Sequence, residues 1–129
     1  MQNNPEYSDV IDEVSQFLIA RAKVCEQAGI AKKSILFDPG YGFGKTLEHN
    51  YALVKHLPDI MSLGFPVLVG MSRKSMIGNL LNRKVDERLA GSVSLATIVA
   101  QMGAQIIRVH DVKETADAVN IVKMLNTIK

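Results

Sequence analysis

Several features that often define the class of a protein are scarce or missing in this sequence. Its 129 residues include one cysteine, Cys25, so no internal disulfide bond can form and a reducing, cytoplasmic location is expected. Basic residues (15) barely outnumber acidic ones (13), which gives no reason to expect a nucleic-acid or membrane partner. No apolar run approaches the roughly 20 residues of a membrane span. The opening MQNNPEYSDV has neither the basic nor the apolar region of a signal peptide.

The common nucleotide and metal motifs are missing as well. The stretch 40–46, GYGFGKT, looks like a phosphate-binding loop, but the Walker pattern requires a glycine where Pro39 stands. The dinucleotide fingerprint fails in the same way, because Lys45 occupies a glycine position. His49 and His56 are seven residues apart rather than four, so they do not form a helical metal-ligand pair. The sequence also has no nucleophile-elbow pattern and no Cys/His cluster.

The most informative stretch that is present runs from Ile35 to Lys45, ILFDPGYGFGK. Its continuous apolar run at 35–37 predicts a buried strand, which Pro39 ends because proline has no N–H for a strand ladder. Glycines at alternate positions, 40, 42 and 44, allow the backbone to approach a ligand closely. Asp38 is therefore expected at the carboxyl end of a buried strand beneath a glycine-rich loop, where parallel α/β proteins place their chemistry.

The rest of the chain reads as a helix followed by three strand–helix units. A first helix is expected to be capped by Ser8 or Asp9 and to stop at Gly29. Further strands are expected at 65–69 and 105–109. The other expected helices run from Thr46 to Gly64 with a break at Pro58, over 76–81, from Asp86 to Gly103, and over 113–128.

The helices carry two apolar faces and one line of small residues. The first helix is expected to bury a stripe that includes the Cys25 thiol, and the last helix a second apolar line. The small residues predict a close packing partner. The stripe of the first helix is Val10, Val14, Phe17, Leu18, Arg21 and Cys25. The apolar line of the last helix is Ala116, Val119, Val122 and Leu125, and the small residues are Ala90, Gly91, Ser92 and Ala96.

Three parallel strands flanked by helices would leave two long edges of the sheet unpaired. A closed (β/α)8 barrel needs about 250 residues. We therefore predict an α/β fold that is the C-terminal portion of a (β/α)8 TIM barrel, with three βα units preceded by a helix. Residues 1–129 are expected to form one half of a single domain without an internal boundary, within a longer protein.

Each predicted strand ends in polar side chains that should meet, because parallel strands bring their carboxyl ends to one face. These are Asp38, the Ser72–Ser75 segment with Arg73 and Lys74, and Arg108 with His110. A carboxylate suits paired N–H groups of a planar heterocycle, and guanidinium groups suit phosphate oxygens. The cluster thus predicts a ligand that has both N–H donors and negative charge, with Arg73 as a candidate phosphate contact.

Each of these side chains also has a purely structural interpretation. Asp38 could cap the amides of its own loop, and Arg73 and Lys74 could be solvated surface charges. Arg108 follows apolar residues in its strand, where an unpaired charge would be costly, so a structural salt bridge is its main alternative. His110 alone would be unremarkable.

Four segments resemble the dihydropteroate synthase family, the folate-pathway enzymes that sulfonamides inhibit. They are DPGYGFGKTLEHNY (38–51), VGMSRKSMIG (69–78), ERLAGS (87–92) and IIRVHDVKET (106–115), and the opening MQNNP is similar to the segment after the family's fifth strand. The resemblance covers nearly the whole chain. It implies a transferase that condenses a dihydropterin hydroxymethyl diphosphate with p-aminobenzoate, giving 7,8-dihydropteroate and diphosphate.

The resemblance also implies roles for individual residues. Asp38 would hold the pterin ring, Lys74 would contact the pterin beside the p-aminobenzoate site, and Arg108 with His110 would bind the pterin side and the diphosphate. The p-aminobenzoate and sulfonamide pocket would be lined by Gly42, Phe43 and Ser75. No residue of this chain is assigned as a catalytic group or as a metal ligand.

The resemblance further implies magnesium bound with the diphosphate, a protein ligand for it outside this chain, and a homodimer formed through C-terminal helices. The family's early strands have no counterpart in the sequence, so residues 1–129 alone are expected to show no turnover. The competing hypotheses are a non-catalytic pterin binder and a pterin-dependent methyltransferase with a similar barrel. The combination of S-R-K-S with R-V-H-D favours the synthase.

Overall fold

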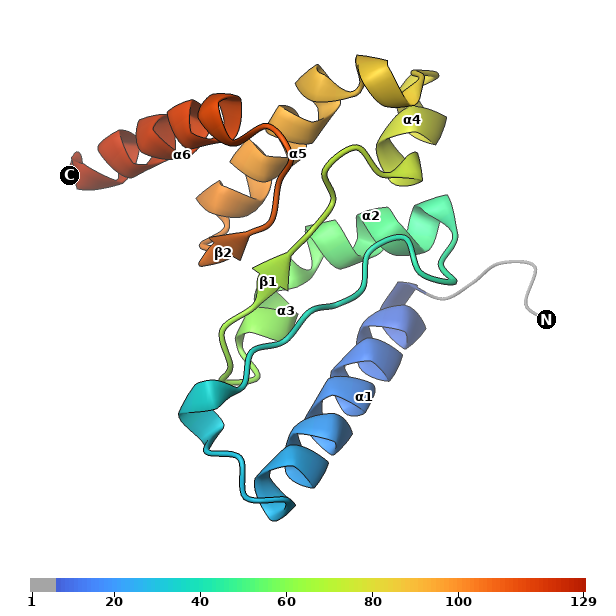
Figure 1. The fold of residues 1–129 in the computed structure, drawn as a ribbon, viewed down its shortest axis with the longest axis vertical. Helices are drawn as coiled ribbons and strands as arrows, with labels where there is room; N and C mark the ends of the chain where they lie inside the picture. The colour runs from blue at the N-terminus through green and yellow to red at the C-terminus, as the bar shows by residue number, and fades with distance from the viewer. Residues whose placement is uncertain (1–6) are drawn as a thin grey trace.

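The computed structural model describes residues 7–129, which form a mainly helical α/β unit around a small parallel sheet (Figure 1). The opening MQNNP and its expected similarity lie outside the described residues. The elements are α1 (Tyr7–Gln27), a 3-10 turn (Lys32–Ser34), α2 (Leu47–Lys55), α3 (Leu57–Met61), β1 (Leu68–Val69), α4 (Ser75–Leu81), a second 3-10 turn (Val85–Glu87), α5 (Leu89–Gln101), β2 (Ile106–Ile107) and α6 (Val112–Thr127).

The sheet consists of two short parallel strands and a single parallel bridge. β1 pairs with β2 in the register Leu68↔Ile106, and Phe37 pairs with Val67 on the other side of β1. The Phe37 amide donates to the Pro66 carbonyl at 2.8 Å. All three expected strands are thus parallel and adjacent in chain order, but each is shorter than predicted. The expectation of a continuously buried first strand is wrong at Leu36, whose side chain is 46% exposed.

The core lies between the sheet and the helices that flank it. α1 packs on α2 and α3, whereas α4 and α6 pack on α5, so α1 and α6 lie at opposite ends of the molecule (Figure 1). The largest side chains with almost no exposure come from the glycine-rich loop, α2, α3, β1 and the residue before it, α4 and α5. They are Tyr41, Leu53, Leu57, Ile60, Val67, Val69, Met76, Ile77 and Val99.

The buried face of α1 is displaced from the predicted stripe. Val10, Ile11, Leu18 and Ala22 are buried, whereas Phe17 is 64% exposed. Arg21 is also exposed and Cys25 only partly buried, so the predicted buried thiol is wrong. The reason is geometric: at about 100° per residue, Phe17 lies about 120° from the centre of the face that carries Leu18 and Ala22, so it points away from the core.

Two helix-start predictions are confirmed and two are wrong. The Thr46 hydroxyl accepts from the His49 amide at 3.1 Å, as a capping residue does, and Pro58 lies in the first turn of the restarted helix α3. Asp86 does not cap the long helix, because it lies in a 3-10 turn and α5 begins at Leu89. Ser8 and Asp9 lie inside α1, which already begins at Tyr7.

The line of small residues on α5 does have a close partner. A Cβ at Gly91 would come within 2.5 Å of Cγ2 of Ile77, so α4 packs directly on this position. The apolar line predicted for α6 is only partly buried. Val122 is 4% exposed, but Leu125 is 58% exposed and Ala116 also faces solvent. The α5 helix covers only one narrow strip of α6. The spacing of apolar residues therefore predicted a wider buried face than the structure shows.

Candidate functional site

The glycine-rich loop is fixed to the core by Tyr41. Its side chain is 0% exposed, and its hydroxyl donates to the carbonyl oxygen of Leu53 in α2 at 3.1 Å. Burial, assisted by the nearby Asp38 carboxylate, raises the pKa of the Tyr41 phenol well above its usual value. Tyr41 is therefore a neutral anchor, and the loop leaves the core at Gly42 and Phe43, both of which are exposed.

Asn50 holds the same loop from α2, and the sequence did not identify it. Its Oδ1 accepts from the Gly42 amide at 2.8 Å, and its Nδ2 donates to the Thr46 carbonyl at 3.0 Å. The residue is only 4% exposed. The available signal was a polar residue one turn beyond the Thr46 cap, which by itself does not separate a buried amide from a solvated one.

Two lysines donate hydrogen bonds to carbonyl groups of the loop, Lys45 from within the loop and Lys74 from the segment after β1. Lys45 Nζ donates to the carbonyl oxygens of Gly40 at 2.8 Å and Phe43 at 3.1 Å. Lys74 Nζ donates to the Tyr41 carbonyl at 2.7 Å and lies 5.1 Å from the centroid of the Phe43 ring. Burial lowers the pKa of both ammonium groups, and for Lys74 the positive charge of Arg108 adds to this effect. The surface-charge interpretation of Lys74 is thus wrong.

Asp38 combines two of the interactions that the sequence left open. Its Oδ1 accepts from the Gly40 amide at 2.9 Å, and its Oδ2 lies 3.8 Å from Nη1 of Arg108. The carboxylate is therefore both a loop cap and one partner of an ion pair. The carboxylate is open to solvent, since 39% of the side chain is exposed. Because the side chains of Asp38 and Arg108 are both open to solvent, each can exchange the other for a ligand group.

Arg108 reaches this position because residue 70 is a glycine. A Cβ at Gly70 would lie 2.5 Å from Nη2 of Arg108 and 3.0 Å from its Cζ. The guanidinium group therefore lies flat against the backbone just after β1, on its way from the end of β2 to Asp38. Its side chain is 57% exposed, so the guanidinium group avoids the desolvation cost expected for a charge buried in an apolar strand.

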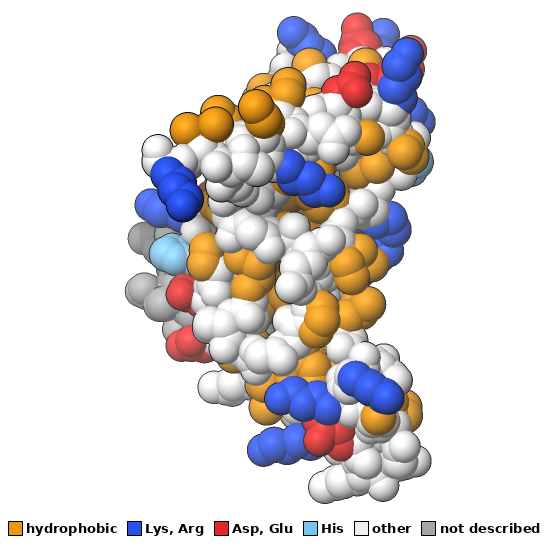
Figure 2. All heavy atoms as spheres, turned by 90° about the vertical axis from the view of Figure 1, so that its left-hand side faces the viewer, with side chains coloured by type: hydrophobic (Ala, Val, Ile, Leu, Met, Phe, Trp, Pro, Cys, Tyr) orange, Lys and Arg blue, Asp and Glu red, His pale blue; other side chains and the backbone are white. Residues whose placement is uncertain are grey.

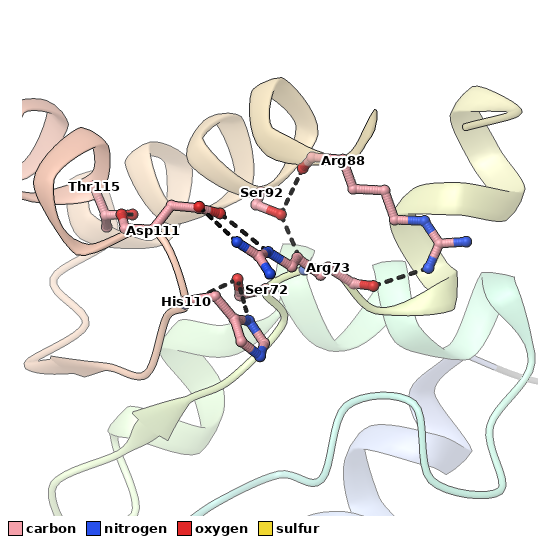
Figure 3. A network of polar contacts seen from close by, with 7 residues as sticks. All are labelled: Ser72, Arg73, Arg88, Ser92, His110, Asp111 and Thr115. Atoms are coloured by element: carbon pink, nitrogen blue, oxygen red, sulfur yellow. Dashed lines mark hydrogen bonds and ion pairs between the residues drawn. The ribbon is translucent and has the colours of Figure 1, made fainter. Parts of the chain in front are cut away.

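The segments after β1 and β2 are linked by a polar network (Figure 3). Nδ1 of His110 lies 2.9 Å from the Ser72 hydroxyl, which also accepts from the His110 amide at 3.2 Å. Nη2 of Arg73 lies 2.8 Å from Oδ1 of Asp111. The candidate phosphate contact Arg73 thus already has a carboxylate partner, and Asp111 was not singled out from the sequence. Ser75 is exposed at the first residue of α4.

The predicted convergence of Asp38, Lys74 and Arg108 is observed. The three residues follow Phe37, β1 and β2 at their carboxyl ends, and the charges of Asp38 and Arg108 both act on the pKa of Lys74. The result is a partly exposed surface with one carboxylate acceptor, the cations of Lys74 and Arg108 with Lys45 nearby, and Phe43, which is 73% exposed. Such a surface can hold a flat ligand with N–H donors at one end and negative charge at the other.

Other kinds of site find less support in residues 7–129. A hollow lined by Phe65, Val67, Gly103 and Gln105 lies at the amino ends of the strands and has no charged lining residue. Within these residues no three His, Cys, Asp or Glu side chains gather where they could hold a metal ion. None of the described helices is long and apolar enough to cross a bilayer.

Comparison with known proteins finds consistent similarity. The family model described as "Pterin binding enzyme" matches residues 1–110. The chain is 55% identical over 123 residues to the dihydropteroate synthase of Escherichia coli (strain K12), covering 95% of this chain and 44% of that protein. The Yersinia pestis dihydropteroate synthase solved with a sulfonamide drug superposes with a TM-score of 0.92 at 50% identity, covering 99% of this chain and 47% of that one. The Xanthomonas albilineans enzyme with 4-aminobenzoic acid gives a TM-score of 0.92 at 45% identity, covering 97% and 46%.

Proposed function

This chain belongs to the pterin-binding enzyme family, and on that premise we propose that the polypeptide carrying it is a dihydropteroate synthase, a transferase of folate biosynthesis. The reaction would join a dihydropterin hydroxymethyl diphosphate to p-aminobenzoate. The chain spans about half the length of the relatives it matches, 44% of the Escherichia coli protein. Activity, substrates and partners are therefore proposed for the whole polypeptide.

The observation that carries the proposal is the meeting of Asp38, Lys74 and Arg108 on one surface. The Asp38 carboxylate would leave Arg108, 3.8 Å away, and accept hydrogen bonds from ring N–H groups of the pterin. Arg108 would then be free to face the diphosphate, with His110 beside it. The exposure of both side chains means that this exchange of partners requires no rearrangement of the core.

The second substrate would bind beside the glycine-rich loop. The Phe43 ring is exposed and close to the Lys74 ammonium, and a Cβ added at Gly42 would lie 3.5 Å from Cδ of Lys74, so the glycine leaves space beside that side chain. An aromatic amine could pack on Phe43, with its carboxylate directed toward Ser75 at the start of α4. Gly42, Phe43 and Ser75 would thus shape the p-aminobenzoate and sulfonamide pocket.

The proposed reaction breaks the bond between the pterin methylene carbon and the diphosphate oxygen, and the electron pair leaves with diphosphate. The amine nitrogen of p-aminobenzoate then bonds to that carbon and releases a proton. Arg108 and His110 would stabilise the departing negative charge, and Asp38 would stabilise the electron-poor ring. These roles require positioned charges, and none of them requires a covalent bond to the protein.

Magnesium, the expected companion of the diphosphate, finds no ligand set in residues 7–129, where no cluster of three suitable side chains exists. The side chains of residues 7–129 therefore do not form a magnesium centre by themselves. If magnesium takes part, its protein ligand would come from elsewhere in the polypeptide.

The proposal extends to architecture. Three adjacent parallel strands with helices between them fit the C-terminal portion of a (β/α)8 barrel, with residues 1–129 in one domain.

We also propose a cytoplasmic homodimer formed through C-terminal helices. Ile121, Met124 and Leu125 on α6 are more than half exposed, which leaves an apolar strip for such a contact. Apolar side chains also lie open elsewhere, as on the face in Figure 2.

Calorimetry on the natural polypeptide tests the function and separates the alternatives. A synthase is expected to bind a pterin, and to bind p-aminobenzoate only with pterin and magnesium diphosphate present. Binding of pterin without any p-aminobenzoate binding would favour a methyltransferase or a non-catalytic binder. Residues 1–129 alone are expected to form no dihydropteroate, and product from that segment would contradict the proposed need for a longer chain.

A further inference from the structure

Arg73 has a backbone conformation that its residue type rarely adopts. Its φ is +59°, in the left-handed region, where a non-glycine residue persists only if its surroundings enforce it. Two hydrogen bonds from α5 and the segment before it do so. The Arg73 amide donates to the Ser92 hydroxyl at 3.0 Å, and the Arg73 carbonyl accepts from Nη1 of Arg88 at 2.8 Å. Ser92 in turn donates to the Arg88 carbonyl at 2.6 Å.

The side chain of Arg73 is fixed from a third direction. Its Nη2 and Nε lie 2.8 and 3.4 Å from the two carboxylate oxygens of Asp111, a two-pronged pairing that sets the plane of the guanidinium group (Figure 3). The Asp111 side chain is 17% exposed, and both of its carboxylate oxygens are engaged by Arg73. This hydrogen bond raises the pKa of Arg73 and lowers that of Asp111, which keeps both groups charged.

The position of Arg73 in the chain gives these contacts a consequence for the site. Ser72 precedes it and holds His110, and Lys74 follows it and reaches the Tyr41 carbonyl at 2.7 Å. The turn at Arg73 therefore sets the direction in which Lys74 leaves the sheet. The segments after β1 and β2 are tied together at adjacent positions, by Ser72 with His110 and by Arg73 with Asp111.

We propose that Asp111 is a positioning residue for the Lys74 and Ser75 side of the pocket, acting through Arg73, and that Arg73 serves this structural link instead of contacting phosphate. Arg88 and Ser92 complete the link by holding the Arg73 backbone. The assignment rests on the proposed function for the identity of the ligand, but the link between Asp111 and residues 71–75 is independent of it.

The effect of one substitution, Asp111→Asn, on ligand affinity distinguishes a positioning role of Arg73 from a phosphate-binding role. Asp111→Asn removes the charge and leaves the size almost unchanged, so it loosens the link while freeing the Arg73 guanidinium. A positioning role predicts about tenfold weaker p-aminobenzoate binding with pterin and magnesium diphosphate present. A phosphate-binding role predicts unchanged or tighter binding of magnesium diphosphate and unchanged p-aminobenzoate binding, and that result would overturn the proposal. Asp12→Asn at an exposed position of α1 is the matched control and is expected to change neither affinity.

Exchanging Arg73 and Asp111 provides a second test, in which binding affinity should be restored as well as lost. Arg73→Asp should weaken p-aminobenzoate binding, and adding Asp111→Arg should restore part of it, because the ion pair is rebuilt in reverse and aspartate tolerates the left-handed backbone. A direct phosphate contact at residue 73 would not be restored by an aspartate there. Failure of the double variant to exceed Arg73→Asp alone would therefore refute the positioning role.

Hydrogen exchange gives a readout that requires no ligand. In Asp111→Asn, amides of residues 71–75 should exchange about tenfold faster, while those of α1 stay unchanged. If the unsubstituted polypeptide binds neither pterin nor p-aminobenzoate but this local change is seen, the proposed function fails and the structural link stands. Unchanged exchange at 71–75 would refute the link whatever the ligand.

Discussion

The ammonium nitrogen of Lys74 lies 2.7 Å from the carbonyl oxygen of Tyr41, thirty-three residues earlier in the chain. This bond joins the glycine-rich loop to the segment after β1. It places the Lys74 ammonium beside Tyr41, the fully buried aromatic residue that anchors the loop. The loop, held also by Asn50 and Lys45, is therefore a fixed wall of the candidate pocket, with Phe43 as its exposed part.

Lys74→Ala and Arg108→Ala should each reduce kcat/KM of the natural polypeptide by at least about 30-fold, which corresponds to about 2 kcal/mol of transition-state stabilisation. Each variant removes a charge-assisted contact that the proposed substrates would use. Steady-state kinetics with both substrates measures the effect, and Lys123→Ala on exposed α6 is the control. Near-normal kcat/KM in either variant would contradict the assigned roles.

Gly70→Ala should damage the site while leaving the protein stable. The new Cβ would displace the Arg108 guanidinium, which now lies 2.5 Å from that position, and so separate it from Asp38. Because the Arg108 side chain is 57% exposed and can turn toward solvent, the free energy of unfolding should change by less than about 1 kcal/mol. Pterin affinity measured by calorimetry should fall.

Gly91→Ala is the matched comparison for Gly70→Ala. Here the Cβ would meet Ile77 and Leu81 in the packed contact between α4 and α5, so stability should fall by about 1 kcal/mol or more. Equal losses of pterin affinity in both variants, or equal losses of stability, would show that the contact with Arg108 is not what matters at Gly70.

Asn50→Ala should lower the free energy of unfolding by about 1–2 kcal/mol, because it removes the two hydrogen bonds that this buried side chain makes to the Gly42 amide and the Thr46 carbonyl. Loosening of residues 40–46 should accompany this loss and weaken p-aminobenzoate binding. Denaturant unfolding and calorimetry measure the two effects. Asn79→Ala, at an exposed position of α4, should change neither.

Tyr41→Phe should be destabilising at neutral pH but less so in alkali. At about pH 7 the variant loses the hydrogen bond to Leu53, at a cost of about 1–2 kcal/mol. The folded pKa of Tyr41 is raised, so above its unfolded value of 10.0 the unfolded chain releases a proton that the folded chain keeps. Stability of the unsubstituted protein therefore falls as the pH rises above about 10, and Tyr41→Phe lacks this component of the loss.

Denaturant unfolding at about pH 7 and about pH 11 measures the difference between the two proteins. Tyr51 and the two lysines titrate in both, so the change in the difference reports Tyr41. A difference that stays constant across this range would mean that the Tyr41 phenol is not held neutral by the fold.

Sequence alone determined the family, the order of the elements and the principal candidate residues. The resemblance of four segments to dihydropteroate synthase is confirmed by the matches to that enzyme. Thr46 and Pro58 gave correct helix starts because capping and proline effects act within a few residues. Asp38, Lys74 and Arg108 could be grouped because parallel strands fix the side on which their ends lie.

The tertiary structure alone decided which partner each polar side chain takes. Nothing local to Arg73 indicates Asp111, which is 38 residues away, and nothing local to Asn50 indicates the Gly42 amide. The same holds for the exposed Phe17 and Leu36, because burial depends on what packs against a residue as well as on its own spacing. Short-range steric and hydrogen-bonding preferences are written in the sequence, whereas contacts between segments distant along the chain exist only once the backbone has folded.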